Sequence, residues 1–395
     1  MSWWIFLAGG WILAVCWLVS GFLPVYFFRK KRVDDCTRAL AEPERWPLVS
    51  VVVAARDESR LIEKSLRSLV AMDYPAFEVI AVNDRSVDGT GDIMDRLAAV
   101  AARIRTLHIL ELPAGWLGKC HALHQGSKRA AGELLLFTDA DVTFAPQTLR
   151  LAVRYLEAHK LDHLVLFPGF VRRGYWEDAL KAYFSVSFSL WTRAWAVSGP
   201  SKNIYIGVGA FNLVRRSAYD GIGGHESLRM EILDDITLGK HLKQQGYRQD
   251  ALLAPRHLEL AWLEGVKGFV KGLEKNAFAG LQFSIAQLLL VTALIVFFIA
   301  TPYIGALVFR DARIYGYLAA VLAMYAGFGI QASGHRDGWR VAPALPVIAC
   351  IFLWTLWHSA FVTLRQGGIR WRDTFYSLND LKRRPYPANK TKIIK

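Results

Sequence analysis

The chain has few cysteines and no repeats. It carries four cysteines in 395 residues, too few and too scattered for a fold held together by disulfides. Cys16 and Cys350 lie within long apolar stretches, whereas Cys36 and Cys120 are isolated. Internal repeats and low-complexity segments are also missing, which argues against a repeat architecture.

Charge is absent from four long stretches. No Asp, Glu, Lys or Arg occurs in Trp3–Phe28, Leu281–Phe309, Ile314–Gly334 or Val341–Leu364. At about 1.5 Å per helical residue, each stretch can cross a hydrocarbon layer of about 30 Å. The sequence therefore predicts an integral membrane protein with one N-terminal and about three C-terminal transmembrane helices. His358 is the one histidine inside these stretches, whereas a transporter would carry more polar pathway residues.

The first apolar stretch lacks a basic segment before it and is followed by Arg29-Lys-Lys-Arg32. This order is typical of an uncleaved anchor, and the positive-inside rule places the polar region that follows in the cytoplasm. We therefore expect a multi-pass protein of the cell (inner) membrane. The expected divisions are an anchor over 1–32, a cytoplasmic domain over 33–280, a transmembrane region over 281–364 and a basic tail over 365–395.

The tail creates a conflict of topology. Residues 365–395 contain nine Lys or Arg and two Asp, which is half of the net charge of +14. Basic residues beside membrane spans usually contact anionic lipid headgroups, and charge alone does not indicate nucleic-acid binding. Three spans would leave this tail outside, whereas its charge should keep it inside. One possibility is that one segment is re-entrant or interfacial, and 314–334 is the weakest candidate for a full span. The other is that the tail does not follow the positive-inside rule.

The polar region alternates apolar runs with amphipathic segments. Runs typical of buried strands are Pro47–Ala55, Phe77–Val82, Thr106–Leu110 and Leu134–Phe137, and helical spacing of apolar residues separates them, as at Leu61–Leu69 and Ile93–Val100. This alternation predicts an α/β fold with right-handed β-α-β units and a mainly parallel sheet.

Two carboxylates end the fourth run. Asp139 and Asp141 are two positions apart, so an extended backbone directs both to the same side. Ligands bind at this end of the strands in open α/β sheets, and paired carboxylates suit a hard divalent cation. The alternative is that both acids cap a following helix or turn.

Five motifs in order resemble the family 2 glycosyltransferases with the GT-A (Rossmann-like) fold. They are Pro47–Glu58, Asn83–Thr90, Gly118-Lys119 with Ala122-Leu123, Asp139-Ala-Asp141 and Leu233–Leu238. The resemblance covers roughly residues 47–280. Within the family the chain is most similar to membrane-bound enzymes that glycosylate lipids, such as the ceramide glucosyltransferases and the hopene-associated glycosyltransferases.

The resemblance implies a nucleotide-binding role for the first motifs. Asp84 would accept a hydrogen bond from the base, and Ala54, Ala55, Arg56 and Glu58 would form the other wall of the base pocket. The alternatives are that Asp84 only caps the next helix and that Arg56 pairs with Glu58 on the surface. Asn83 stands where the family usually has an acid.

The resemblance also implies how the diphosphate is held. Lys119 lies at a helix start, where N–H groups and the dipole favour anions; the alternative is a solvated lysine. Asp139 would lie toward the ribose and the metal, and Asp141 would ligate Mg²⁺ or Mn²⁺. The donor implied is a nucleotide sugar, with UDP-hexose favoured.

Two further motifs bear on the acceptor. Gly207 and Gly209, in the expected strand Tyr205–Asn212, permit close backbone approach, and the family places sugar and acceptor contacts there; a plain β-bulge is the alternative. The family uses the second acid of the Asp234-Asp235 pair as general base, which implies Asp235, with Asp234 beside it. The pair would also be a good helix cap.

The sequence departs from the family before the C-terminal spans. It lacks the Gln-x-x-Arg-Trp motif and reads Val270–Phe278 instead, which argues against a processive polysaccharide synthase. Tyr175–Val197 and Leu263–Phe283 are candidates for interfacial helices, although the first is nearly as typical of a buried helix.

We therefore expect an inverting, metal-dependent glycosyltransferase that moves a hexose to a hydroxyl of a membrane lipid. Two alternatives stay open: transfer to a polyprenyl phosphate, which needs no strong base, and a nucleotide-binding membrane scaffold without turnover.

Overall fold

The computed structural model describes all residues except 1, 263, 334–337 and 383–395, so most of the basic tail lies outside the described residues. The described chain divides into two compact units. One, the α/β unit, is formed by residues 30–171 and 194–262 with the described residues 379–382. The other, the apolar unit, is formed by residues 1–29, 172–193 and 263–378.

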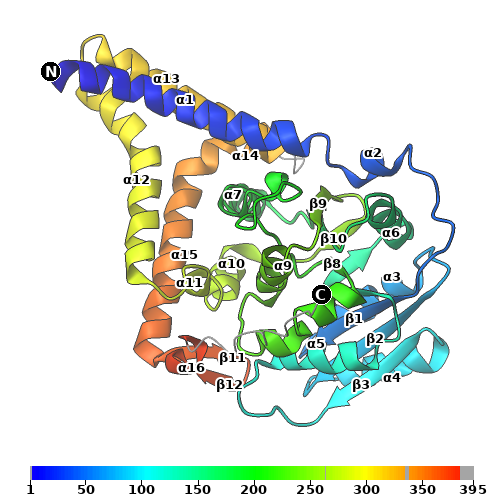
Figure 1. Ribbon diagram of the computed structural model, residues 1–395. Coiled ribbons are helices and arrows are strands. Elements are labelled where there is room, and N and C mark those ends of the chain that lie inside the picture. The colour runs from blue at the N-terminus through cyan, green and yellow to red at the C-terminus, as the bar shows by residue number, and fades with distance from the viewer. Residues whose placement is uncertain (1, 263, 334–337, 383–395) are drawn as a thin grey trace, which may run out of the picture. The chain divides into compact units, whose positions relative to one another are not determined.

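A seven-stranded sheet is the framework of the described α/β unit, with the strand order β3-β2-β1-β4-β8-β6-β9 (Figure 1). The strands β1, β2, β3 and β4 are parallel, β8 runs antiparallel to β4 and β6, and β9 is parallel to β6. Their bounds are Val49–Ala55, Phe77–Asp84, Ile104–Ile109, Leu134–Asp139, Asn212–Arg215 (β8), His163–Phe167 (β6) and Gln249–Leu253 (β9). The predicted α/β fold with a mainly parallel sheet is confirmed.

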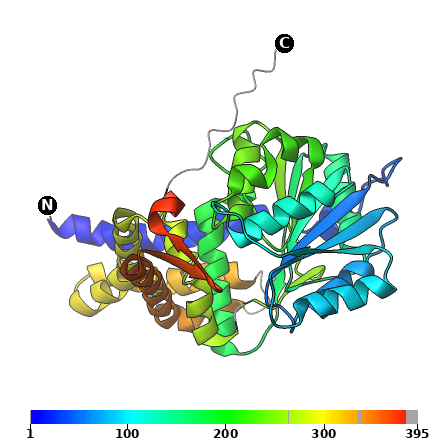
Figure 2. The ribbon, with the colours of Figure 1, turned by 90° about the horizontal axis from the view of Figure 1, so that it is seen from below.

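Helices cover both faces of this sheet (Figure 2). Because side chains alternate along a strand, Val51 and Val53 of β1 point to one face and Val52 to the other. The first face is covered by α3, α4 and α6, and the second by α5, α8 and α9. Their bounds are Ile62–Val70 (α3), Thr90–Val100 (α4), Gly118–Arg129 (α5), Thr148–Ala158 (α6), Arg216–Gly221 (α8) and Asp234–Gln244 (α9).

Smaller elements complete the α/β unit. A second sheet has the order β5-β10-β7, with β5 at Val142–Phe144, β7 at Gly169–Phe170 and β10 at Leu258–Leu260. Helix α2 (Val33–Thr37) follows the basic residues 29–32. Lys31 pairs with the buried Asp250, which also accepts a 2.9 Å hydrogen bond from the Tyr155 hydroxyl. This network fixes the entry of the chain into the α/β unit.

Four helices among the described residues are long and apolar enough to cross a membrane. They are α1 (Ser2–Phe28), α12 (Ile285–Val308), α13 (Arg313–Ala332) and α15 (Leu345–Gln366), with α14 (Gly338–Val341) leading into α15. All four lie in the stretches that the sequence identifies by their lack of charge. In the apolar unit α1 lies along α13, with Gly10 against Gly316 and Gly21 against Gly327, so the two backbones approach closely.

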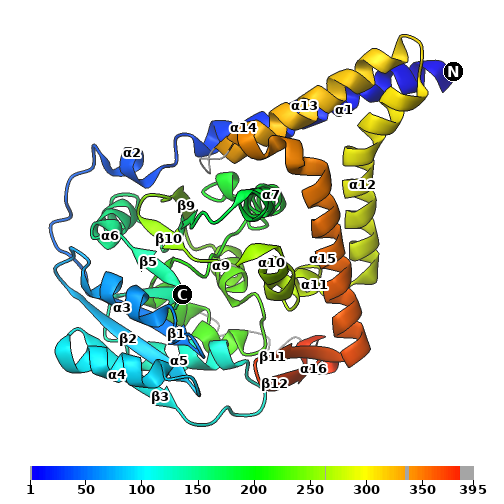
Figure 3. The same cartoon turned by 180° about the vertical axis from the view of Figure 1, so that it is seen from behind.

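Helices α12 and α15 form an antiparallel pair (Figure 3). Leu288, near the start of α12, packs with Leu356 and Ala360 of α15, and the Trp357 indole donates a 3.0 Å hydrogen bond to Thr292 Oγ1. The hairpin after α15, formed by β11 (Gly368–Trp371) and β12 (Thr374–Ser377), returns to the residues before α12, since Lys275 Nζ lies 3.4 Å from the Trp371 ring centroid. The start of α12 and the end of α15 are therefore at the same end of the pair.

Three shorter helices complete the apolar unit: α7 (Tyr175–Thr192), α10 (Gly265–Leu273) and α11 (Ala277–Gly280). Helix α7 buries Glu177 and Lys181 as an ion pair, and Glu177 also accepts a 2.6 Å hydrogen bond from the Gly265 N–H. Trp176 and Trp191 stay exposed near its two ends. The helix therefore has buried residues and exposed tryptophans, and the choice between an interfacial and a buried helix stays a prediction.

Candidate active site

The carboxyl ends of the central strands bring the predicted nucleotide-binding residues together. Strand β1 ends at Ala55, β2 at Asp84 and β4 at Asp139. The register pairs Ala54 with Asp139 and Ala55 with Asn83. These residues therefore form one edge, which is where open α/β sheets bind ligands.

Asp84 lies between the end of β2 and the first turn of α5. It is 3% exposed, and Arg85 contacts both of its oxygens, at 2.7 and 3.1 Å. A Cβ atom on Gly118 would lie 2.4 Å from Asp84 Oδ2. Arg85 therefore fixes the orientation of the Asp84 carboxylate. The sequence analysis assigned no role to Arg85.

The loop after β1 is tied to the loop after β2. Glu58 and Ser59 donate their backbone N–H groups to Thr90 Oγ1 (2.9 Å) and Asp88 Oδ2 (3.0 Å). Asp88 also accepts a 3.1 Å hydrogen bond from Thr90 N, the first residue of α4, and these bonds lower its pKa to about 2 although burial opposes them. Arg56 lies 3.9 Å from Asp57. Asp88 thus supports the start of the helix and also joins the two loops.

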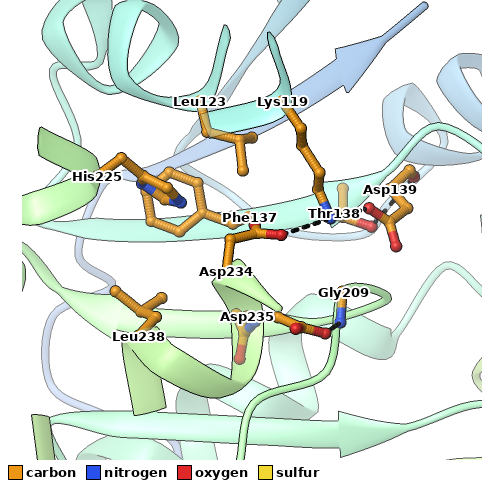
Figure 4. Close-up of a pocket in the computed structure, with 11 residues that line it drawn as sticks. Lys119, Leu123, Phe137, Thr138, Asp139, Gly209, His225, Asp234, Asp235 and Leu238 are labelled. Carbon is orange, nitrogen blue, oxygen red and sulfur yellow. Dashed lines mark hydrogen bonds and ion pairs between the residues drawn. The ribbon is translucent and has the colours of Figure 1, made fainter. Parts of the chain in front are cut away.

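Lys119 lies among the acids of the site (Figure 4). Its Nζ is 2.8 Å from Asp139 Oδ1 and 3.4 Å from Asp234 Oδ1. Burial by itself would lower the pKa of Lys119, but Asp139, Asp234 and Asp235 together hold it well above its ordinary value. The ammonium group stays charged, so Lys119 is an internal counter-ion and not a solvated surface lysine.

Asp235 is held by two backbone N–H groups. Its Oδ2 accepts a 2.7 Å hydrogen bond from Gly209 N, and its Oδ1 accepts a 2.8 Å bond from Ile236 N. The Gly209 carbonyl in turn accepts a 2.9 Å bond from Asp139 N. Gly209 therefore connects the acid at the end of β4 with the acid at the start of α9, as Figure 4 shows for Gly209 and Asp235.

The predicted strand Tyr205–Asn212 is wrong, because β8 begins only at Asn212. Along 206–209, backbone N–H groups donate hydrogen bonds to side chains and not to a neighbouring strand. Ile206 N donates to Gln249 Oε1 (3.1 Å), and Val208 N donates to Asn212 Oδ1 (3.3 Å). The buried His163 contacts both side chains: its Nε2 is 3.1 Å from Asn212 Oδ1, and its Nδ1 is 2.6 Å from Gln249 Nε2. This polar network holds the segment as a loop against Asp235.

The site has more negative than positive charge. Asp139, Asp234 and Asp235 act electrostatically on the ammonium group of Lys119, and Lys119 in turn acts on Asp141. Burial, Asp139 and Glu58 raise the pKa of Asp141 to about 7. Burial and the adjacent Asp234 raise the pKa of Asp235 to about 7, against a lowering effect of Lys119. Such a cluster favours a bound cation or a proton.

The described residues contain no group of three or more His, Cys, Asp or Glu side chains close enough to hold a metal ion. A pair of carboxylates such as Asp139 and Asp141 would therefore leave most of the coordination of an ion to a bound molecule. This donor set fits Mg²⁺ or Mn²⁺, which prefer oxygen and commonly share their coordination with substrate phosphates.

Several residues of the site were not predicted. Phe137, Leu123, Leu238 and His225 form its apolar wall. Burial, followed by Lys119, lowers the pKa of His225 to about 3, so its ring is neutral. Of these four residues, only His225 has a side chain that could take part in chemistry. Its neighbours in the sequence, including the glycine-rich turn 221–224, do not indicate that it is buried beside Lys119.

The close packing of Gly207 against α9 allows the position of the 206–209 loop to be tested. A Cβ atom on Gly207 would lie 1.7 Å from the Asp235 carbonyl oxygen. We expect Gly207→Ala to push α9 away and to destabilise the fold by roughly 1–3 kcal/mol, as overpacking does. The midpoint of thermal unfolding measures this. Gly174→Ala is the matched control, since nothing lies within 4 Å of its Cβ position; equal midpoints for both variants would contradict the described loop.

The comparisons with known proteins agree with this architecture. Residues 50–223 match the family model for glycosyl transferase family 2. The 4,4'-diaponeurosporenoate glycosyltransferases of Staphylococcus aureus strains are 25% identical over 203 residues, which is 50% of this chain and 52% of theirs. The chain thus spans about half the length of the curated relatives it matches.

Two solved structures are similar at lower sequence identity. A mannosyltransferase from Pyrobaculum calidifontis, in complex with GDP-Man and Mn²⁺, is 20% identical, with a TM-score of 0.49 over 90% of this chain and 98% of that one. TarS 1–349 of S. aureus in complex with UDP-GlcNAc is 17% identical, with a TM-score of 0.41 over 83% and 95%.

The family match covers the part of the chain from β1 to β8. This part contains Asp84, Lys119, Asp139 and the Gly207–Gly209 loop. The order of the motifs, the mainly parallel sheet and the acids at its carboxyl edge agree with it. Residues 50–223 of this chain therefore form a glycosyl transferase family 2 domain.

Proposed function

We propose that this protein is a membrane-bound, inverting glycosyltransferase that moves a hexose from a nucleotide sugar, preferably a UDP-hexose, to a hydroxyl group of a membrane lipid. The observation that carries the proposal is the joining of Asp139 and Asp235 through Gly209, with Lys119 2.8 Å from Asp139. In this proposal, Asp139 and Lys119 contact the diphosphate, and Asp235 is the base beside them.

The donor nucleotide lies along the carboxyl edge of the sheet. Asp84 accepts a hydrogen bond from the base, and Ala54, Ala55, Arg56 and Glu58 form the facing wall. Lys119 provides the positive charge nearest the diphosphate. Because Lys119 already contacts two acids, its ammonium group is oriented before the donor arrives.

Asp139 and Asp141 would hold a Mg²⁺ or Mn²⁺ ion in this site. When bound, such an ion neutralises charge on the departing diphosphate, an effect worth several kcal/mol. Lys119 stabilises the same negative charge from the side of α5. The excess of carboxylates around Lys119 is the structural support for this cation.

Asp235 takes the proton from the acceptor hydroxyl. The acceptor oxygen then forms a bond to the anomeric carbon, and the bond from that carbon to the diphosphate breaks with its electron pair going to the diphosphate. Attack opposite the leaving group inverts the anomeric configuration. Each oxygen of Asp235 accepts one backbone N–H, which leaves a lone pair free for the hydroxyl proton.

The apolar helices support a lipid acceptor and an inner-membrane location with the catalytic domain in the cytoplasm. The helices α1, α12, α13 and α15 have the length and hydropathy of membrane spans. Many of their large apolar side chains are exposed, among them Trp4, Phe22, Leu290 and Trp354. Lipid chains would cover such side chains.

The direct test is release of nucleoside diphosphate from a panel of nucleotide sugars by the full-length, detergent-solubilised protein with Mn²⁺ and bacterial lipid extract. We expect lipid-dependent release from one donor. Asp235→Asn should lower the rate by on the order of 10²- to 10⁴-fold, the usual contribution of a general base, while donor binding persists. Asp141→Ala should lower both release and donor binding.

Two outcomes of this assay favour the alternatives. If Asp235→Asn keeps most of its activity while Asp141→Ala loses it, transfer to a polyprenyl phosphate replaces transfer to a hydroxyl. Donor binding without release in any extract would favour the non-catalytic scaffold.

The raised pKa of Asp235 predicts the pH dependence of transfer. A base must be unprotonated, so activity should fall as the pH drops through about 7. Removing the neighbouring charge with Asp234→Asn lowers the pKa of Asp235, and the acid limb should move to lower pH by on the order of one unit. A pH–rate profile of kcat/KM measures this; an unchanged or upward-shifted limb would rule out Asp235 as the titrating base.

The antiparallel pairing of α12 and α15 predicts that the hairpin β11–β12 lies on the side of the membrane where α12 begins. Helices α1 and α13, which lie along each other, then add no net crossing. In a cysteine-free background, Asp373→Cys after α15 and Val87→Cys in the α/β unit should react alike with an impermeant maleimide in sealed vesicles. Ala312→Cys, between α12 and α13, should show the opposite accessibility. Labelling of Asp373→Cys together with Ala312→Cys would contradict this topology.

A further inference from the structure

The apolar unit contains a cleft between α10 and α15 that has no place in sugar transfer. Its volume is about 680 Å³, within the range of about 300–1,000 Å³ typical of ligand sites. Its walls are partly basic and partly apolar, being lined by Val266, Lys267, Val270, Lys271 and Glu274 on one side and Cys350, Ile351, Trp354 and His358 on the other.

Two lysines form its basic rim. Lys267 and Lys271 are four residues apart on α10, so they lie on the same face of the helix. Both are exposed, and neither has an acidic partner in the described part of the chain. Glu274 also lines the cleft, and its carboxylate is 3.2 Å from His358 Nε2 on the opposite wall. The rim has two adjacent positive charges available for one anion.

The opposite wall is apolar and belongs to a helix long enough to span a membrane. Ile351 and Trp354 of α15 face the cleft, and Trp354 is 65% exposed. On α10, Phe269 and Leu273 are buried on the side that packs into the protein. A molecule with an anionic head and an apolar chain matches both walls at once.

We propose that this cleft binds an anionic membrane phospholipid, with its phosphate on Lys267 and Lys271 and its acyl chain along Ile351 and Trp354. The inference rests on the proposed membrane location but not on sugar transfer. It assigns to the apolar unit a lipid site that would hold α10 against α15.

Cys350 provides a probe inside the cleft, because it is exposed and lines it. In the full-length protein with the other three cysteines replaced, the rate of Cys350 labelling by N-ethylmaleimide would be measured in micelles doped with phosphatidylglycerol or with phosphatidylcholine. We expect phosphatidylglycerol to slow the labelling and phosphatidylcholine to leave it unchanged. Inorganic phosphate alone should give no protection.

The double variant Lys267→Gln/Lys271→Gln should need about 25-fold more phosphatidylglycerol for half-protection, since each basic residue near an anionic headgroup contributes about fivefold in affinity. The matched control Lys160→Gln/Lys202→Gln removes two exposed lysines of the α/β unit and should keep the protection. A second control, Leu294→Cys in a Cys350→Ser background, places the probe on the exposed face of α12 and should show no preference between the lipids.

Equal protection by both lipids, protection that survives in Lys267→Gln/Lys271→Gln, or no protection at all would overturn the proposal. Protection by inorganic phosphate alone would also overturn it, because the site would then bind the anion without its chain. None of these readouts requires turnover, so they are independent of the outcome of the donor assay.

Discussion

The contact of Lys119 with Asp139 and Asp234 is the interaction on which the site depends. Four carboxylates at one edge of a sheet would repel one another, and burial would add to their cost. The ammonium group, 2.8 Å from one acid and 3.4 Å from another, compensates part of that charge. Burial and the remaining negative charge raise the pKa of Asp235 to about 7, which suits the general-base role proposed for it.

A short loop couples this charge cluster to the rest of the sheet. Gly209 contacts Asp139 with its carbonyl and Asp235 with its N–H, so both acids move with one peptide segment. The loop is fixed from behind by Gln249 and Asn212, whose side chains bind its backbone. Because Gln249 belongs to β9 and Asn212 to β8, the far half of the sheet holds the base in place.

Local patterns were sufficient for the first half of the α/β unit. The Val-rich runs gave β1 to β4 within a few residues, because buried parallel strands are continuously apolar. The acids at their ends could be placed on one edge from the strand direction alone. The stretches without charge located all four long apolar helices, since length and hydropathy define them.

The contacts between distant segments could not be predicted in this way. Residues 205–212 have the composition of a strand, but Gln249 and Asn212 satisfy their backbone, and no local pattern indicates a partner 43 residues away. The pairing of Arg85 with Asp84 is local, yet an arginine in a loop has many possible partners. The cleft of the apolar unit depends on the packing of α10 against α15, which are separated in the sequence by α11, α12, α13 and α14.

The central claim is that Asp139 and Asp141 complete a metal site only together with a diphosphate. The measurement that tests it most directly is a titration of Mn²⁺ against the full-length protein, followed by the electron paramagnetic resonance signal of free Mn²⁺, with and without UDP. The account predicts weak binding to the protein alone, at least about tenfold tighter binding when UDP is present, and loss of that gain in Asp141→Ala. Binding of Mn²⁺ that is unaffected by UDP, or that is unchanged in Asp141→Ala, would contradict it.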